Sequence, residues 1–198
     1  MAVQLVTEFY NNNAEDLVSR YESISFETVH QIALPYLPTP PAAVLDIGAG
    51  SGRDAAWFAE NGYQVTAVEP AERMIELAQA THQQGINWVC DSLPQLGQLS
   101  NYNEFFDVIL LSGVWMHIRP EDRSASLAKM HQLNKIGGIL ILSLRHGLLE
   151  QDRPMHLVSF EELSDFAREF GYEIILRDAS LDKLNRNEIS WETVILKK

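Results

Sequence analysis

Short apolar runs alternate with longer amphipathic stretches along most of the chain beyond residue 41. Apolar runs of this length, bounded by polar and turn-forming residues, are typical of buried strands. Seven strands are therefore expected, at residues 43–47, 64–69, 86–90, 106–112, 137–144, 172–178 and 191–197. The stretches between most of them predict helices, because their apolar positions recur three and four residues apart.

Four helices are expected between the strands. The first spans about Arg53 to Glu60, the second carries Met74 and the third begins at Pro120. The fourth starts at Ser159, where Glu162 three residues later completes a capping box. Strands that alternate with helices predict an α/β fold, in which crossover connections build a parallel sheet with helices on both faces.

The last two strands depart from this rhythm. Only residues 179–190 separate them, and this stretch has no apolar helix face. We expect the two strands to pair as a hairpin, so the final strand is antiparallel in an otherwise parallel sheet.

A proline cluster, "ALPYLPTPP" at residues 33–41, divides the chain. Proline cannot occupy a helix interior, so the chain turns there. We expect residues 1–40 to form an N-terminal helical cap segment and residues 41–198 to form one globular domain.

The charge balance changes the list of expected partners. The formal net charge is −12, from 27 acidic and 15 basic residues, which opposes nucleic-acid binding. No apolar run approaches the roughly 18 residues of a membrane span, and the first residues have no basic leader pattern. Cys90 is the single cysteine, so no internal disulfide is expected and a cytoplasmic location is the simplest interpretation. Its alternation with Trp88 predicts a core thiol.

The stretch "VLDIGAGSGRD" at residues 44–54 carries the strongest chemical signal. Glycine tolerates positive φ and has no Cβ, so Gly48, Gly50 and Gly52 predict a turn that brings backbone close to a ligand. The dinucleotide fingerprint needs a third glycine where this chain has Arg53. Three acids, Asp46, Glu69 and Asp91, fall at carboxyl ends of the expected strands. So much negative charge suits a cationic nucleoside better than a pyrophosphate.

At these residues the sequence resembles the class I S-adenosylmethionine-dependent methyltransferases. "VLDIGAGSG" is similar to their first motif, "VTAVEP" to the second and "VCDSLP" to the adenine motif. "FFDVILLSGVWMHI" and "KIGGILILSLRHG" are similar to the fourth and fifth. "GSGRDAAWFAENGYQVTAVE" followed by "VWMHI" also resembles the small tellurite-resistance type. The resemblance implies a Rossmann-like, seven-stranded, mostly parallel sheet with an antiparallel last strand, and S-adenosylmethionine as the cofactor.

The resemblance also implies a role for each matching residue. The methionine moiety would lie against Asp46, Gly48, Ala49 and Gly50, with its carboxylate near the helix start at Arg53. Glu69 would bind the ribose, and Pro70 and Ala71 would flank the adenine. The adenine amino group would donate to Asp91, beside the amides of Ser92 and Leu93, and the carbonyls around Leu111 and Ser112 would face the cofactor's ammonium.

The acceptor side carries weaker signals. Tyr21 in the cap, Trp115 after the fourth expected strand and Arg145 after the fifth are candidate substrate contacts. Each has a structural alternative: helix packing for Tyr21, a core position for Trp115 and a surface ion pair for Arg145. His117 and His146 leave adjacent strand ends, where they would converge as catalytic bases or serve only in the structure.

Two remaining features complete the candidate chemistry. Arg145 and Arg153 could clamp an anionic substrate bidentately, but we expect Arg153 to pair with surface acids instead. Three further histidines, His30, His82 and His131, fall in helical stretches and have no ligand-like spacing, so no metal site is expected.

Three functions remain open at this level. The preferred one is methyl transfer from S-adenosylmethionine to a small-molecule acceptor, because the chain is acidic and lacks an "NPPY"-like motif after the fourth strand. The second is a sensor or partner subunit that binds the nucleoside without turnover. The third, an NAD-dependent oxidoreductase, would require the glycine spacing to be misinterpreted.

Overall fold

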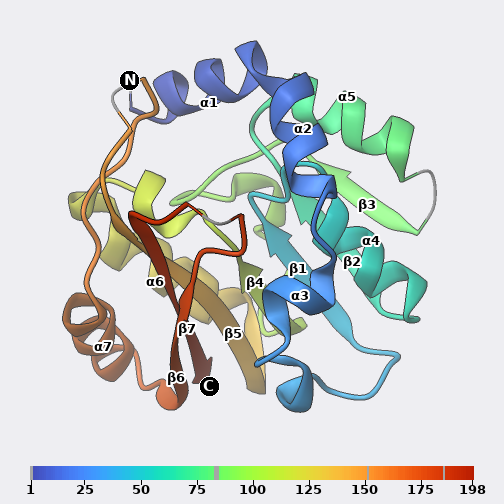
Figure 1. Ribbon diagram of the computed structural model, residues 1–198. Helices are drawn as coiled ribbons and strands as arrows, with labels where there is room; N and C mark the ends of the chain where they lie inside the picture. Colours follow the sequence, from blue (N-terminus) through green and yellow to red (C-terminus); the bar gives the residue numbers. More distant parts are fainter. Residues whose placement is uncertain (1, 83–84, 151, 185) are drawn as a thin grey trace.

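A computed structural model describes residues 2–82, 85–150, 152–184 and 186–198 of the chain. One seven-stranded sheet forms its centre, with the strand order β3-β2-β1-β4-β5-β7-β6 (Figure 1). The strands are β1 (Ala43–Ile47), β2 (Gln64–Val68), β3 (Ile86–Val89), β4 (Phe106–Leu111), β5 (Asn134–Gly147), β6 (Glu173–Leu181) and β7 (Ile189–Lys197).

The strand directions match the sequence pattern. The pairs formed by β1, β2, β3, β4 and β5 are parallel, whereas β7 runs antiparallel to both β5 and β6. The predicted hairpin and the antiparallel last strand are therefore confirmed. The hairpin is longer than predicted, because β6 continues to Leu181, which pairs with Ser190 of β7.

The helices between the strands begin and end close to the expected positions. They are α4 (Arg53–Glu60), α5 (Glu72–Thr81), α6 (Pro120–Leu133) and α7 (Phe160–Glu169). The capping box is present in α7, where the Ser159 side chain accepts a hydrogen bond from the backbone N–H of Glu162 at 3.1 Å.

Alternating strand residues supply two cores, one on each face of the sheet. Ile109 and Leu111 of β4 belong to the cluster that also contains residues of α6 and α7, whereas Val108 and Leu110 belong to the cluster under α4. A strand buried on both faces is apolar on both, which is why residues 108–111 of β4 form a continuous hydrophobic run.

The N-terminal region consists of α1 (Ala2–Asn12), α2 (Ala14–Glu22), α3 (Phe26–His30) and the short 3-10 helix η1 (Leu34–Tyr36). In Figure 1, α1 and α2 run across the upper end of the molecule, and α3 lies beside α4. The Phe26 ring stacks on Trp57 of α4 with centroids 4.0 Å apart. This contact fixes α3 on the domain.

The described part of the chain contains two further 3-10 helices, η2 (Gly97–Leu99) and η3 (Trp115–His117). Among the same residues, no helix has both the length and the apolarity that crossing a bilayer requires. Cys90 is exposed, so the prediction of a core thiol is wrong. It directly follows β3, an edge strand of the sheet, where one flank has no neighbouring strand.

We expect Phe26→Ala to lower the free energy of unfolding by about 3–5 kcal/mol, because it removes a buried ring that packs on Trp57 and Phe58. The matched control is Ile136→Ala, an apolar truncation at a side chain that is 73% exposed, which should cost less than about 1 kcal/mol. Urea denaturation of both variants measures the difference. Equal losses would show that α3 does not anchor the N-terminal region.

Candidate active site

The glycine turn connects β1 to α4 with three positive φ angles, 72° at Gly48, 56° at Gly50 and 83° at Gly52. The amides of Gly48 and Ala49 both donate to the Val68 carbonyl, at 2.7 and 3.0 Å, which ties the turn to the end of β2. A Cβ at Gly48 would lie 2.4 Å from Cγ2 of Val114. Glycine is therefore required at this position for both conformation and space.

Asp46 lies in β1 immediately before the turn and is 1% exposed. Its Oδ2 is buried and has no hydrogen-bond partner among the described residues. Burial, together with the nearby carboxylate of Asp54, raises the pKa of Asp46 well above its usual range. A buried carboxylate oxygen without a partner is costly, so the site is suited to a ligand that donates to it.

Glu69 follows β2 and is 5% exposed. Its Oε2 accepts from the Gly50 amide and its Oε1 from the Ala71 amide, each at 3.0 Å. These two bonds fix the carboxylate in the glycine turn and leave further acceptor capacity on each oxygen. Burial raises the pKa of Glu69 to about 7, although the two amides oppose this shift.

A single pocket joins the turn to the N-terminal helices and the ends of β4 and β5. Most of the predicted site residues line it. These are Tyr21, Asp46, Gly48, Ala49, Gly50, Arg53, Glu69, Pro70, Ser112, His117 and Arg145.

Of the predicted adenine contacts, only Pro70 lines this pocket, whereas Ala71, Asp91, Ser92 and Leu93 lie outside its lining. Asp91 instead binds its own loop: Oδ1 accepts from the Ser92 amide at 2.8 Å and Oδ2 from the Gln98 amide at 2.9 Å. Leu93 and Leu111 are buried in the core, and Ala71 packs on α2. The adenine roles of Ala71, Asp91, Ser92 and Leu93 therefore stay predictions, as does the role of the Leu111 carbonyl toward the cofactor's ammonium.

Trp115 does not reach the pocket. It is fully buried in the cluster beneath α6, where the Arg123 guanidinium lies 5.9 Å from the ring centroid. The structure thus gives Trp115 the core position that was the alternative to substrate contact. Its neighbour Met116 lines the pocket instead.

The two candidate bases are not brought together. His146 lies outside the pocket lining, with Nε2 3.6 Å from Oε1 of Glu192 on β7. It follows Arg145 in the strand, and adjacent strand residues point to opposite faces, so only Arg145 enters the pocket. His117 does line the pocket.

His117 is held as a neutral ring. Its Nδ1 lies 2.7 Å from the Pro154 carbonyl oxygen, which can only accept, so Nδ1 carries the proton. Its Nε2 therefore accepts from the Tyr10 hydroxyl at 3.1 Å. Burial, together with the positive charge of Arg153, lowers the pKa of His117 to about 3. A group with this pKa is a weak base near neutral pH.

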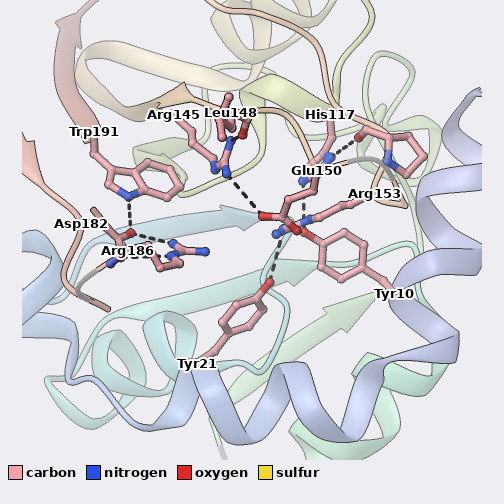
Figure 2. Close-up of polar contacts among 11 residues, drawn as sticks. Tyr10, Tyr21, His117, Arg145, Leu148, Glu150, Arg153, Asp182, Arg186 and Trp191 are labelled. Atoms are coloured by element: carbon pink, nitrogen blue, oxygen red, sulfur yellow. Dashed lines mark hydrogen bonds and ion pairs between the residues drawn. The ribbon is translucent and has the colours of Figure 1, made fainter. Parts of the chain in front are cut away.

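The sequence did not single out Tyr10, and it left a substrate clamp as the less favoured role of Arg153. Figure 2 shows both beside His117 and Tyr21. Arg153 Nη2 donates to the Tyr10 hydroxyl and, at 3.4 Å, to the Tyr21 hydroxyl. The prediction that Arg153 pairs with surface acids is wrong, because this side chain is 7% exposed and lines the pocket. Tyr10 sits on α1, far from any motif, and no sequence signal marks it.

A buried ion pair closes the pocket beneath α3. His30 Nε2 lies 2.8 Å from Oδ2 of Asp54, and Arg53 Nε donates to Oδ1 of the same carboxylate at 2.7 Å. The Arg53 guanidinium also donates to the Tyr21 carbonyl at 3.2 Å. His30 thus has a structural partner. Within the described residues, no group of three or more His, Cys, Asp or Glu side chains is arranged to hold a metal ion.

The raised pKa of Glu69 predicts a pH-dependent stability. Between about pH 4.5 and about pH 7 the unfolded chain has released this proton while the folded chain holds it, so stability falls as pH rises through that window. The loss should approach about 3 kcal/mol, measured by urea denaturation as the wild-type profile minus that of Glu69→Gln. Glu60→Gln, at an exposed position of α4, controls for losing one negative charge. Parallel wild-type and Glu69→Gln profiles would contradict the prediction.

The comparisons with known proteins agree with this geometry. Residues 45–142 match the family model described as "Methyltransferase domain". An uncharacterized methyltransferase of Staphylococcus carnosus is 24% identical over 181 residues, which cover 80% of each chain.

Solved structures share the fold. The 1,6-didemethyltoxoflavin-N1-methyltransferase of Burkholderia thailandensis superposes with a TM-score of 0.78 at 21% identity, covering 99% of this chain and 88% of that one. A TehB-like S-adenosylmethionine-dependent methyltransferase of Corynebacterium glutamicum has a TM-score of 0.70 at 18% identity, covering 94% and 99%. With the matched domain, the order of the motifs and the sheet topology, the chain belongs to the class I S-adenosylmethionine-dependent methyltransferase superfamily.

Proposed function

We propose that this enzyme transfers the methyl group of S-adenosylmethionine to a small-molecule acceptor inside the pocket that lies at the carboxyl ends of β1, β2, β4 and β5 and is covered by the N-terminal helices. The observation that carries the proposal is the pair of buried carboxylates, Asp46 and Glu69, beside the glycine turn. Two acids in a dry site suit a ligand that brings positive charge and hydrogen-bond donors.

The residues present fit the cofactor. Oδ2 of Asp46, buried without a partner, would accept from the methionine moiety or its bound water. Glu69, oriented by two backbone amides, has acceptor capacity left for both ribose hydroxyls. The absence of a Cβ at Gly48, where one would meet Val114, leaves the turn open to the ligand.

When bound, S-adenosylmethionine supplies a methyl group that its sulfonium has already activated. The chain's own part is therefore to align the acceptor and to exclude water. Tyr21 covers the turn from α2, since its ring carbons would lie 3.7 Å from a Cβ at Gly50. His117, with a pKa of about 3 and both ring nitrogens engaged, positions Tyr10 rather than taking a proton.

A small acceptor is supported by the enclosure of the pocket and by the acidity of the chain. The N-terminal helices contribute Val6, Tyr10 and Tyr21 to the lining, so acceptor and cofactor share a covered space. The net charge of −12 opposes nucleic acid as the acceptor. The Burkholderia thailandensis neighbour was solved with the small molecule 1,6-didemethyltoxoflavin and S-adenosylhomocysteine bound.

We expect calorimetric titration to show micromolar binding of S-adenosylmethionine and S-adenosylhomocysteine and no binding of NAD. Glu69→Gln should weaken both sulfur nucleosides about thirtyfold, because one hydrogen-bonded charged contact is worth about 2 kcal/mol. Glu60→Gln should bind them like the wild type. Binding of NAD in place of the two nucleosides would overturn the proposed function.

Gly48→Ala should weaken S-adenosylmethionine about tenfold or more, because the added methyl group needs the space of Val114 as well as a strained φ. The matched control is Gly137→Ala, where φ is +80° but no atom lies within 4 Å of the added Cβ. This control shares the conformational strain and lacks the clash in the site. If calorimetry gave equal affinities for the two variants, the turn would not be part of the binding site.

A further inference from the structure

The charge balance of the pocket is opposite to that of the chain. Acidic residues outnumber basic ones by 27 to 15 in the whole sequence. The pocket lining contains six basic residues, Arg20, Arg53, Arg145, Arg153, Lys183 and Arg186, and four acidic ones, Asp46, Asp54, Glu69 and Asp182. Positive charge has therefore been gathered at this one place.

Two of these cations have their charge accounted for within the chain. Arg53 pairs with Asp54 at 2.7 Å. Arg186 pairs with Asp182 at 2.6 Å, and that carboxylate also accepts from the indole N–H of Trp191 at 2.8 Å. Neither guanidinium needs a ligand to offset its burial.

Arg145 is different. Its side chain is 3% exposed, and its Nε is buried without a hydrogen-bond partner among the described residues. Nη1 donates to the Leu148 carbonyl at 2.8 Å. The one carboxylate that it contacts is Glu150, at 3.3 Å, whose side chain is 40% exposed. An ion pair with so exposed a partner is weak.

Arg153 has still less compensation. It is 7% exposed, its Nε is also buried without a partner, and no carboxylate of the described chain lies within ion-pair distance. Its hydrogen bonds go to the hydroxyls of Tyr10 and Tyr21. Burial raises the pKa of Tyr10 well above its usual range, so this phenol is neutral and supplies no counter-charge.

The two guanidiniums lie on the same side of the pocket. Figure 2 shows Glu150 between Arg145 and Arg153, with its carboxylate reaching Arg145. Burying an unpaired cation costs several kcal/mol, and the cost is offset when an anion enters with good geometry. Glu150 lies outside the lining of this pocket, and its contact shows that a carboxylate can reach the Arg145 guanidinium.

We propose that Arg145 and Arg153 form an anion subsite that holds a carboxylate or phosphate group of the methyl acceptor, displacing Glu150. The term acceptor rests on the proposed function. Tyr10 and Tyr21 fix the Arg153 guanidinium, and His117 fixes Tyr10. A guanidinium held in one orientation suits bidentate recognition of a planar or tetrahedral anion.

The position in the sheet separates this subsite from the cofactor's own carboxylate. Asp46 belongs to β1 and Glu69 follows β2, whereas Arg145 belongs to β5, two strands beyond β1. Neighbouring strands are about 4.8 Å apart, so the anion subsite lies about 10 Å along the sheet edge from the glycine turn. The acidic end suits the cationic cofactor, and the basic end suits an anionic acceptor.

The test observes the side-chain Nε–H resonances of both arginines in the isotope-labelled full chain saturated with S-adenosylhomocysteine. Acetate and inorganic phosphate are the probes, acetamide is the neutral analogue of acetate, and ionic strength is held constant. Arg168, paired with Asp165 on the surface of α7, is the internal reference. Arg145→Lys and Arg153→Lys identify the resonances while keeping the charge.

We expect saturable shifts of both resonances with one anion or both, at millimolar concentrations, and none with acetamide. The response to acetate against that to phosphate distinguishes a carboxylate from a phosphate group. Arg153→Gln should weaken the anion about tenfold and leave S-adenosylmethionine affinity unchanged, whereas Arg168→Gln should change neither. If Arg153→Gln does not fold, Arg153→Lys should still weaken the anion several-fold, because Lys lacks the planar fork.

Three results would overturn the inference. The first is the absence of a saturable shift up to about 50 mM of either anion. The second is an equal shift at Arg168, which would indicate an adventitious ion only. The third is loss of S-adenosylmethionine affinity in Arg153→Gln, which would assign the guanidinium to the cofactor's carboxylate and leave the proposed function intact. Failure of the proposed function itself would appear separately, as absent nucleoside binding by the wild type.

Discussion

The site depends on the reversal of strand order between β1 and β4. From β1 the chain adds strands first on one side, through β2 and β3, and then on the other, through β4 and β5. The connections leave β1 and β4 in opposite directions, so a crevice opens at their carboxyl ends. The glycine turn follows β1, and Val114 follows β4. Arg145 lies near the end of β5, and all three line the pocket. Side chains from many different elements line the pocket because those elements meet at this edge of the sheet.

Within the crevice, burial turns ordinary charged residues into a divided binding surface. Asp46 and Glu69 lose water at one end, and Arg145 and Arg153 lose it at the other. If these two acids and two arginines were in contact, they would form ion pairs with one another and serve only in the structure. Held apart by intervening strands, they stay available to ligands. The chain accepts a stability cost at both ends, and binding recovers it.

The sheet and the glycine turn could be predicted because local patterns specify them. Residues 108–111 of β4 are all apolar because both faces of the strand are covered, and the glycines mark positions of positive φ. The acceptor half could not be predicted in the same way. Tyr10 and Arg153 are 143 positions apart, and only the tertiary fold brings them into contact. The predicted convergence of His146 with His117 does not occur. Arg145 enters the pocket, and the adjacent strand residue, His146, points to the opposite face. The predicted substrate contact of Trp115 is absent because this side chain is fully buried in the core beneath α6.

The N-terminal helices pack against different hydrophobic clusters. Phe26 of α3 and Ala33 belong to the core beneath α4, whereas α1 and α2 rest on a small separate cluster formed with Ala71 and Met74 of the α5 region. Lifting α1 and α2 would therefore expose far less apolar surface than unfolding the domain, so the opening has its own, lower free energy. Tyr10 and Tyr21 belong to these helices, so an opening of α1 and α2 would change access to the pocket while the sheet stays folded. Amide hydrogen exchange should show these two helices opening before α3.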